Sequence, residues 1–303
     1  MAAGAVGAYF GARMADAGHD VFFIARGAHL DAIKKNGLKV DSALGNTVIK
    51  NANVTDDPKT VGPVDIVLFA VKLWDTEKAA EQTRPLIGPD TRVISLQNGI
   101  DSYDRIAPII GKEHAVGGAT YLATVIAAPG VISHTSPFAK IVCGRMDGKD
   151  DAQLSAFADA AKKANIDIAV TREMPRELWQ KFIFLSTLAS TTAGTRQPIG
   201  AIMADPDMKS LFRKLMEETR AVGEARGVKV GMDYIDERMK FASETAPKGM
   251  KASMAHDLER GNRLELDWLA GAVCALGREL KVPTPANDAV YALLKPYRMG
   301  RPA

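Results

Sequence analysis

Short apolar runs alternate with helical and turn-rich segments over the first part of the chain. The runs 21–25, 65–71 and 92–96 are short and mostly apolar. Such runs are typical of parallel strands that are buried on both faces of a sheet. Segments with helical spacing lie between them, for example 75–86. This alternation predicts a doubly wound α/β sheet.

The second part of the chain has a helical pattern instead. Apolar positions recur at helical spacing over 177–192 and 207–226, and no strand-like alternation interrupts them. A polar stretch that begins at Thr171 separates the two patterns. We therefore predict an N-terminal Rossmann-type domain over residues 1–171 and an all-helical C-terminal domain over residues 172–303.

The first residues of the chain predict a strand-to-helix turn that holds a pyrophosphate. Gly4 lets the backbone approach the phosphates, and Gly7 lets the following helix pack against the sheet. The N-terminus of that helix offers free N–H groups and the positive end of its dipole. Gly4, Ala5, Val6 and Gly7 are the predicted cofactor contacts. Ala2 replaces the first glycine of the full motif, and a Gly/Ala-rich helix start is the structural alternative.

A turn of this kind follows a central strand of the sheet. The sequence begins at the turn itself, with Met1 only three residues before Gly4. Because a sheet without its central strand would fold poorly, we expect a few apolar residues before Met1.

The residue that ends the run 21–25 bears on the type of cofactor. Sites that prefer NAD usually carry Asp or Glu there, about 20 residues past the first glycines, to hold the ribose hydroxyls. Arg26 stands at this point, with His29 nearby. Because Arg can pair with a 2′-phosphate, the sequence predicts NADP (NADPH). The alternative for Arg26 is a solvated strand end.

Polar residues also end two consecutive predicted strands. Lys72 follows 65–71, and Asn98 follows 92–96. Ligands of doubly wound sheets bind outside the carboxyl ends of the strands. We therefore expect Lys72 and Asn98 to face the same crevice as the glycine turn. The alternatives are a surface lysine and a turn former before Gly99.

The helical part contains three candidate site residues. Lys181 interrupts a strongly apolar run, where a charge is costly unless it faces a cleft. Desolvation there would lower its pKa, which suits an acid catalyst. The alternative is a lysine on the solvent side of an amphipathic helix. Ser253 and Glu265 are weaker candidates, with an N-cap and a helix-dipole partner as their structural alternatives.

Composition excludes several classes of protein. The net charge is only +3 and no long basic run occurs, which argues against nucleic acid as a partner. Cys143 and Cys274 have neither metal-like spacing nor a disulfide pattern, so we predict no metal and a reducing compartment. No apolar run is long enough to span a bilayer, and no signal peptide is recognisable. We therefore expect a cytoplasmic protein without a membrane partner.

In their order and spacing, these features resemble the ketopantoate reductases (2-dehydropantoate 2-reductases) over nearly the whole chain. The resemblance implies a Rossmann domain, a helical domain and an active site in the cleft between them. It also implies NADPH-dependent reduction of 2-dehydropantoate to pantoate, a step towards pantothenate and coenzyme A. The matching segments are the turn Gly4-Ala-Val-Gly7, Arg26, Ala70-Val-Lys72, Gln97-Asn98-Gly99, Leu178-Trp-Gln-Lys181, Ser253 and Glu265.

The resemblance also implies a role for each candidate residue. Lys181 resembles the family's catalytic lysine, which gives a proton or positive charge to the carbonyl oxygen. Asn98 resembles the residue that places the substrate and the nicotinamide, and Glu265 the carboxylate that orients the lysine. Ser253 resembles the hydroxyl that receives the substrate carboxylate. Lys72 resembles a residue beside the cofactor phosphate or ribose.

Two positions on the substrate side depart from the family pattern, and Ala2 in place of glycine is a milder departure. Family members commonly carry asparagines one and two helical turns beyond the lysine, where this chain has Leu185 and Ala189. Each lost polar contact weakens binding of a hydroxylated substrate by about 1–3 kcal/mol. A reductase of a more apolar 2-oxo acid and a non-catalytic NADP-binding redox sensor therefore remain alternatives. Leu185 also argues against a β-hydroxyacid dehydrogenase, which needs asparagine there. The expected partner is a small 2-oxo acid, and the oligomeric state is left open, with a homodimer among the options.

Overall fold

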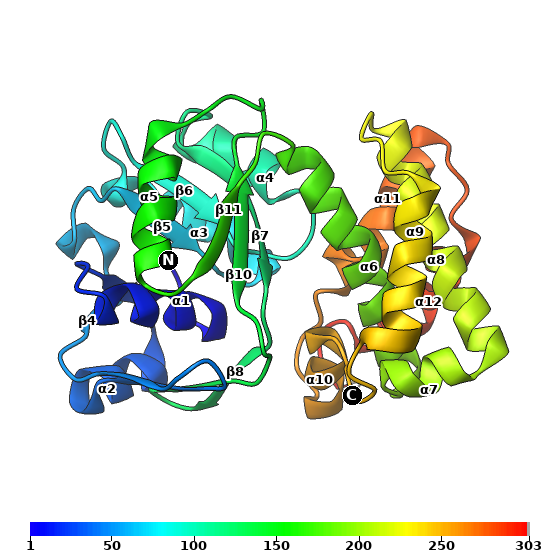
Figure 1. Ribbon diagram of the computed structural model, residues 1–303, viewed down its shortest axis with the longest axis horizontal. Coiled ribbons are helices and arrows are strands. Elements are labelled where there is room, and N and C mark those ends of the chain that lie inside the picture. Colours follow the sequence, from blue (N-terminus) through cyan, green and yellow to red (C-terminus); the bar gives the residue numbers. More distant parts are fainter. Residues whose placement is uncertain (302–303) are drawn as a thin grey trace. The chain divides into compact units, whose positions relative to one another are not determined.

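The computed structural model describes residues 1–301. The chain divides into two compact units, Met1–Met174 and Pro175–Ala303 (Figure 1). The first unit is α/β and the described elements of the second are helices, which confirms the predicted fold class. The division lies between Met174 and Pro175, whereas the sequence analysis places the domain boundary between 171 and 172.

Unit 1 is built on three sheets. The largest has the strand order β11-β10-β7-β6-β5, in which β5, β6 and β7 run parallel. β10 pairs antiparallel with β7 and parallel with β11. These strands are β5 (Ile66–Phe69), β6 (Arg92–Ser95), β7 (Ala115–Tyr121), β10 (Lys140–Gly144) and β11 (Asp167–Val170).

The two smaller sheets contain the remaining strands. β1 and β4 form a parallel pair, and four further strands form a sheet in the order β3-β2-β9-β8. Their bounds are β1 (Phe22–Ile24), β2 (Leu38–Ser42), β3 (Thr47–Ile49), β4 (Asn53–Thr55), β8 (Thr124–Ala128) and β9 (Val131–His134).

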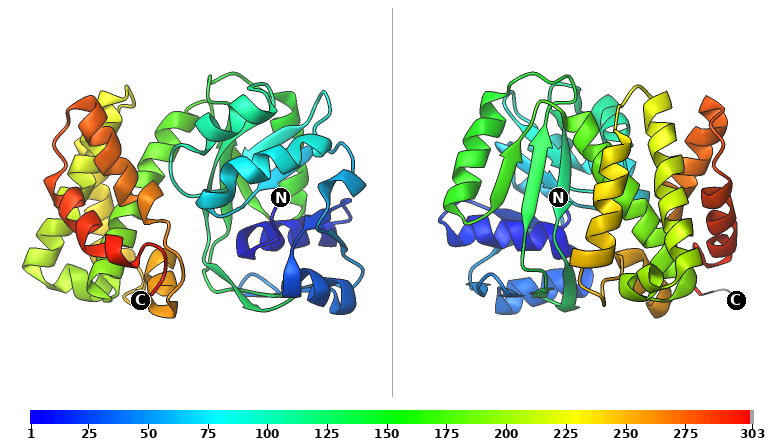
Figure 2. Two further views of the ribbon diagram at one scale, coloured as in Figure 1. Left: turned by 180° about the vertical axis from the view of Figure 1, so that it is seen from behind. Right: turned by 45° about the vertical axis from the view of Figure 1, so that its right-hand side comes forward.

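Alternate residues of the central strands enter two different cores. Val67, Phe69 and Val93 pack in a cluster with α3 and α4. Ile94 and Val116 pack in a second cluster with α1 and α5. Figures 1 and 2 accordingly show α5 on one face of the large sheet and α3 with α4 on the other. The helices of this unit are α1 (Ala5–Asp16), α2 (Gly27–Asn36), α3 (Thr76–Thr83), α4 (Ser102–Ile110) and α5 (Ala152–Lys163).

The helix expected over 75–86 is shorter than the sequence predicts. α3 ends at Thr83, and a 3-10 turn over Arg84–Leu86 follows it. Pro85 occupies this turn, and it has no backbone N–H with which to continue the α-helix.

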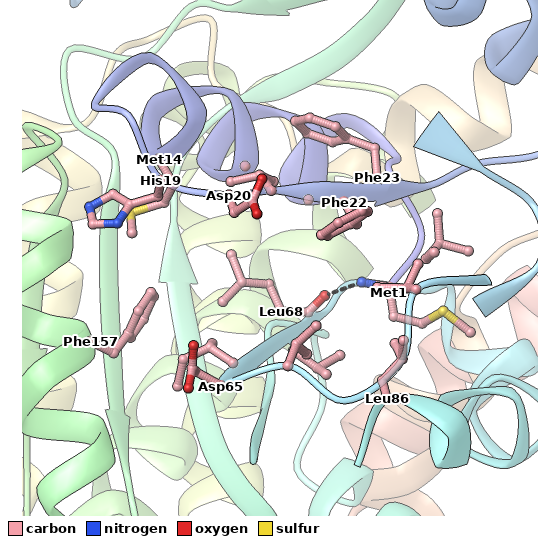
Figure 3. Close-up of a pocket in the computed structure, with 18 of the residues that line it drawn as sticks. Met1, Met14, His19, Asp20, Phe22, Phe23, Asp65, Leu68, Leu86 and Phe157 are labelled. Carbon is pink, nitrogen blue, oxygen red and sulfur yellow. Dashed lines mark hydrogen bonds between the residues drawn. The ribbon is translucent and has the colours of Figure 1, made fainter. Parts of the chain in front are cut away.

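A gap separates β1 from β5. Only the first three residues of the chain lie between them, and the ammonium group of Met1 donates a hydrogen bond to the Leu68 carbonyl oxygen (Figure 3). This gap makes the two-stranded sheet separate from the five-stranded sheet in the residues that the structure describes.

Unit 2 is organised on two long helices, α6 and α8. They approach closely at Gly223 of α8, where a Cβ atom would lie 2.7 Å from the ring of Trp179 on α6. None of the helices between residues 1 and 301 has the length and apolarity needed to cross a membrane. The helices are α6 (Met174–Thr195), α7 (Ile199–Ala204), α8 (Pro206–Ala225), α9 (Met232–Lys240), α10 (Ser253–Arg260), α11 (Ala270–Leu280) and α12 (Pro285–Leu294).

Candidate functional site

The glycine turn at the start of α1 has one open face and one closely packed face. A Cβ atom added to Gly4 would meet no atom within 4 Å. A Cβ atom added to Gly7 would lie 2.5 Å from the carbonyl oxygen of Ala2 and 3.4 Å from the Cβ atom of Ala70. Gly4 is the N-cap of α1 and has no side chain that could bond to the first-turn N–H groups, which an α-helix leaves without intrahelical partners. The turn therefore fits the pyrophosphate of a dinucleotide.

Backbone hydrogen bonds fix this turn at the carboxyl ends of two strands. The Ala3 N–H group donates to the Ile24 oxygen at 2.7 Å, and the Ala70 N–H group donates to the Met1 oxygen at 3.0 Å. Ala2 lies between these bonds with φ 61°, a left-handed conformation that favours glycine. The alanine that replaces the first glycine of the motif thus keeps the backbone shape of the turn.

Lys72 and Asn98 follow two neighbouring parallel strands. β5 and β6 pair with Phe69 opposite Ser95, so both strands end at the same edge of the sheet. Lys72 is exposed, and its ammonium lies 5.6 Å from the centre of the Trp74 ring. Asn98 is partly buried. The structure thus brings both residues to the edge that carries the glycine turn, as the strand pattern predicts.

Gln97 connects the loops at this edge, a role that was not predicted from the sequence. Its side-chain amide donates to the Val71 oxygen at 3.1 Å and to the Thr76 hydroxyl at 2.8 Å. It is buried and therefore holds the loop that carries Lys72 against the end of β6. The sequence feature that could have indicated this role is the position of Gln97 directly before Asn98, at the end of a strand.

Arg26 forms an ion pair that the sequence pattern does not indicate. Its guanidinium Nη2 lies 3.6 Å from the Oδ2 atom of Asp75, and its side chain is 62% exposed. His29 is engaged elsewhere, since its Nδ1 atom accepts a hydrogen bond from the Gly130 N–H group at 3.0 Å. Burial lowers the pKa of His29. Arg26, rather than His29, is the cation at the end of β1.

Lys181 on α6 is partly buried, unlike the solvent-facing lysine of the structural alternative. Burial lowers the pKa of its ammonium group from 10.5 to about 8, and the negative charge of Glu265 opposes this effect. Glu265 is itself only 7% exposed and directly precedes a 3-10 turn over Leu266–Trp268. Unit 2 therefore pairs a buried carboxylate electrostatically with an ammonium group that gives up its proton readily.

The other predicted residues of unit 2 lie on α10 and α6. Ser253 is the exposed first residue of α10, and the N-cap is Ala252, so the N-cap alternative for Ser253 is wrong. The Ala252 N–H group donates to the hydroxyl of Thr192 on α6 at 3.3 Å, which ties the start of α10 to that helix. Leu185 is partly buried and Ala189 almost fully buried.

α6 also carries buried hydroxyl groups that were not predicted as site residues. The hydroxyl oxygens of Ser186, Thr187 and Ser190 are buried and make no hydrogen bond within the described residues. A buried polar group without a partner is costly, so these hydroxyls are unusual in a helix interior. The signal in the sequence is a polar cluster inside an otherwise apolar helix.

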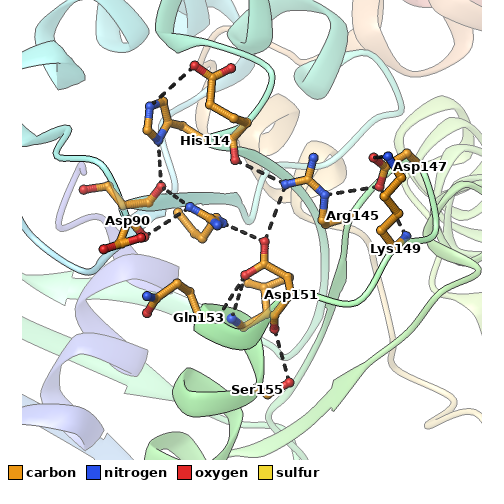
Figure 4. A network of polar contacts seen from close by, with 12 residues as sticks. Asp90, His114, Arg145, Asp147, Lys149, Asp151, Gln153 and Ser155 are labelled. Atoms are coloured by element: carbon orange, nitrogen blue, oxygen red, sulfur yellow. Dashed lines mark hydrogen bonds and ion pairs between the residues drawn. The ribbon is translucent and has the colours of Figure 1, made fainter.

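A polar network lies at the opposite, amino end of β6 (Figure 4). The Arg92 Nε atom lies 2.7 Å from the Asp151 carboxylate, and Arg145 approaches the same carboxylate at 3.5 Å. Asp151 also caps α5 by accepting from the N–H groups of Gln153 and Leu154. Because ligands of such sheets bind at carboxyl ends, this network serves stability.

The thiols and possible metal ligands offer no competing chemistry in the described part of the chain. Residues 1–301 contain no cluster of three or more His, Cys, Asp or Glu residues that could hold a metal ion. Cys143 and Cys274 are buried and free. Burial raises the pKa of each thiol to about 12, so neither forms a thiolate at neutral pH.

Comparison with known proteins covers both units of the chain. The family model described as "Ketopantoate reductase PanE/ApbA" matches residues 2–148, and the model of its C-terminal part matches residues 173–298. A 2-dehydropantoate 2-reductase from Mesorhizobium japonicum is 32% identical over 314 aligned residues, which cover 97% of this chain and 95% of the relative.

Solved structures agree with these matches. A PanE/ApbA family ketopantoate reductase from Ralstonia eutropha superposes with a TM-score of 0.87 at 32% identity, covering 98% of this chain and 97% of the other. A 2-dehydropantoate 2-reductase from Geobacter metallireducens superposes with a TM-score of 0.91 at 28% identity, covering 97% of each chain. The chain therefore belongs to the ketopantoate reductase family and is an oxidoreductase of the 2-dehydropantoate 2-reductase type.

Proposed function

We propose that this protein reduces the 2-oxo group of 2-dehydropantoate, or of a close 2-oxo acid, to a hydroxyl group with NADPH as the hydride source. The observation that carries the proposal is the environment of Lys181. Burial lowers the pKa of this lysine to about 8, and the negative charge of the buried Glu265 limits that decrease. A group with such a pKa is mostly protonated at pH 7 and still a competent acid.

The chemistry divides between the cofactor and Lys181. A reduced nicotinamide, when bound, would supply the hydride that the carbonyl carbon receives. Negative charge then develops on the carbonyl oxygen, and the Lys181 ammonium stabilises that charge and gives the oxygen its proton. Glu265 keeps Lys181 protonated, because its charge raises the lysine pKa against the effect of burial. Asn98 and Ser253 are proposed to position the substrate.

Arg26 supports the choice of NADP. Family membership indicates a nicotinamide cofactor, and an exposed guanidinium at the end of β1 suits a 2′-phosphate. Lys72 is proposed to assist on the cofactor side, together with the turn from Gly4 to Gly7. Arg26→Ala should raise the KM for NADPH far more than the KM for NADH. Equal effects on both cofactors would contradict the proposed role of Arg26.

Leu185 and Ala189 favour a second candidate, a reductase of a more apolar 2-oxo acid. Both lie on α6, and residues four apart on a helix share one face. From Lys181 onwards this face therefore continues with two apolar side chains. A pocket that lacks hydrogen-bonding groups there would prefer a substrate without a hydroxyl group.

The first experiment is a substrate panel. NADPH oxidation is followed spectroscopically with 2-dehydropantoate and with smaller and more apolar 2-oxo acids. Fast turnover of 2-dehydropantoate supports the first candidate, and turnover of only an apolar 2-oxo acid supports the second. NADPH binding without turnover of any member would overturn the proposed activity in favour of a redox sensor.

Variants of the lysine test its role as acid. Lys181→Met is expected to lower kcat by about 10²–10⁴-fold, the usual contribution of a general acid, while NADPH still binds. Lys162→Met, at a lysine 62% exposed on α5, is the matched control and should leave kcat unchanged. Retained turnover in Lys181→Met would refute the assignment.

The substrate preference is tested by restoring one polar group. Leu185→Asn should raise kcat/KM for 2-dehydropantoate by about tenfold relative to an apolar 2-oxo acid, the size expected for one hydrogen bond. Leu293→Asn, at a side chain 72% exposed on α12, is the control for the substitution itself. An unchanged ratio would mean that position 185 does not contact the substrate.

A further inference from the structure

A buried histidine of unit 1 holds a hydroxyl group on each of its ring nitrogen atoms. His134 is the last residue of β9, and only 3% of it is exposed. Its Nδ1 atom lies 2.8 Å from the hydroxyl oxygen of Ser42 on β2. Its Nε2 atom lies 2.8 Å from the hydroxyl oxygen of Ser136, which is also buried. Neither the glycine turn nor the strand ends of the candidate site include this histidine.

The hydrogen bonds of the ring decide where its proton lies. The Nε2 atom is also 3.1 Å from the carbonyl oxygen of Phe138, which can only accept a hydrogen bond. Nε2 therefore donates, and in a neutral ring Nδ1 accepts from the Ser42 hydroxyl group. Burial lowers the pKa of His134 against the opposing effect of the Phe138 bond, and the charge of Arg13 adds to the decrease. The ring is therefore a neutral donor on one side and an acceptor on the other.

On the Ser42 side, the ring is fixed to the helix that follows the glycine turn. The Nη2 atom of Arg13 on α1 donates to the Ser42 hydroxyl oxygen at 3.2 Å. Tyr9 of the same helix packs on the imidazole ring of His134, with 4.5 Å between the two ring centres. His134 is thus held against α1, the helix whose first turn fits a pyrophosphate.

On the Ser136 side, the ring supports the segment that leaves β7. The Ala123 N–H group donates to the Ser136 hydroxyl oxygen at 2.9 Å. The Thr135 N–H group donates to the Ala123 carbonyl oxygen at 3.0 Å. Both polar backbone groups of Ala123 are therefore held by the two residues that follow His134. Leu122 is partly exposed and Ala123 is exposed, so the segment still presents a surface to a ligand.

Segment 121–123 stands at the edge of the large sheet where ligands bind. β7 pairs parallel with β6, so its carboxyl end points to the edge that carries Lys72 and Asn98. The strand order at this edge is β7-β6-β5. A dinucleotide with its 2′-phosphate at Arg26 and its pyrophosphate at the glycine turn crosses the end of β5 first and then that of β6. Its nicotinamide half is then the part nearest to β7.

We propose that His134 is a positioning residue for the nicotinamide half of the cofactor. It sets the place of segment 121–123 relative to α1, through Ser136 on one side of the ring and Ser42 on the other. Because the ring is buried, it acts through this segment and does not touch the ligand. The proposal rests on the proposed nicotinamide cofactor, but it is independent of the substrate and of the role of Lys181.

Binding of two ligands tests the proposal. The first is the reduced cofactor, NADPH or NADH, whichever the unaltered protein binds more tightly. The second is the matching fragment without a nicotinamide, 2′,5′-ADP or ADP. Calorimetry measures both without a 2-oxo acid, so a wrong substrate or the absence of turnover does not affect the result. An unaltered protein that binds neither cofactor would overturn the proposed function as well, whereas the variants below test only His134.

His134→Leu removes both hydrogen bonds of the ring. It should weaken binding of the cofactor by at least about fivefold, the size of one hydrogen bond, and leave that of the fragment within about twofold. His134→Gln should recover most of the affinity, because its amide also presents a donor and an acceptor on one carbon atom. His114→Leu is the matched control, since His114 bonds to the Thr91 carbonyl oxygen at 2.9 Å and directly precedes β7 at its other end. It should change neither affinity.

Two results would overturn the proposal. Equal weakening of cofactor and fragment in His134→Leu would mean that the histidine only stabilises unit 1. An unchanged affinity for the cofactor would mean that segment 121–123 does not act on the nicotinamide half. If His134→Leu does not fold, Ser136→Ala removes only the hydroxyl group that holds Ala123, and the same two affinities decide.

Discussion

Two glycines in one turn should respond in opposite ways to the same added methyl group. Gly4 has φ −68° and ψ −172°, an extended conformation that alanine adopts without strain, and no atom lies within 4 Å of the position that a Cβ atom would take there. Gly7 lies in the first turn of α1, and its Cβ would be 2.5 Å from the Ala2 oxygen. Gly4→Ala therefore tests ligand space, and Gly7→Ala tests internal packing.

The expected magnitudes follow from these contacts. For Gly4→Ala, the loss of a favourable N-cap and the lower entropy of the unfolded chain nearly cancel, so Tm should stay within about 2 °C. For Gly7→Ala, helix propensity alone would stabilise by up to about 1 kcal/mol. Overpacking against a backbone oxygen costs about 1–3 kcal/mol. We expect a net loss of about 1–2 kcal/mol, or roughly 2–8 °C in Tm.

Binding separates the two variants further. In Gly4→Ala the methyl group occupies the open face of the turn, so NADPH affinity, measured by calorimetry, should fall at least about tenfold in a normally stable protein. Unchanged affinity would show that the phosphates do not approach this face. A rise in Tm for Gly7→Ala, as propensity alone predicts, would refute the packing argument.

Three further predictions concern charge and backbone strain. Glu265→Gln removes the negative charge that raises the Lys181 pKa. The alkaline decline of kcat/KM, expected near pH 8, should therefore move to lower pH. An unmoved pH profile would mean that the charge of Glu265 does not act on Lys181. Asp151→Asn should destabilise by about 2–3 kcal/mol at pH 7 in denaturant titrations. Burial raises the pKa of Asp151, but bonds from Arg92 and from backbone N–H groups outweigh it and hold the pKa below 3.8. The stability is therefore present above about pH 4 and lost below it, and the variant's deficit should vanish in acid. Ala2→Gly removes the backbone strain of an alanine in the left-handed conformation and should raise Tm by a few degrees at most. A lower Tm would mean that the packing of the Ala2 methyl group contributes more to stability than the strain costs.

Local patterns predicted most of the architecture because each element carries its own signal. The segment 207–226 has helical spacing and is followed by Gly227, and α8 spans Pro206–Ala225. The run 92–96 is mostly apolar, and β6 spans Arg92–Ser95. Strand ends also brought Lys72 and Asn98 to one edge, since parallel strands share a direction.

Contacts between distant residues were not predictable in the same way. The pairing of Arg26 with Asp75 and the bonds from Gln97 to Val71 depend on how separate loops meet in space. No periodicity in the sequence encodes such meetings. The position of Glu265 near Lys181 was expected only through a family resemblance, because nothing in the spacing of the two residues brings them together.

Lys181 is a candidate site residue because a buried charge in an apolar helix lowers the stability of the fold. Its pKa is lowered from 10.5 to about 8, so the folded protein holds the proton less tightly than the unfolded chain. Below pH 8 this difference costs about 3 kcal/mol of stability, and the cost disappears as pH rises from 8 to 10.5. An apolar residue in α6 would avoid it. Glu265 reduces the cost but does not remove it, since the lysine pKa remains lowered. We therefore propose that α6 keeps Lys181 for its proton rather than for the fold.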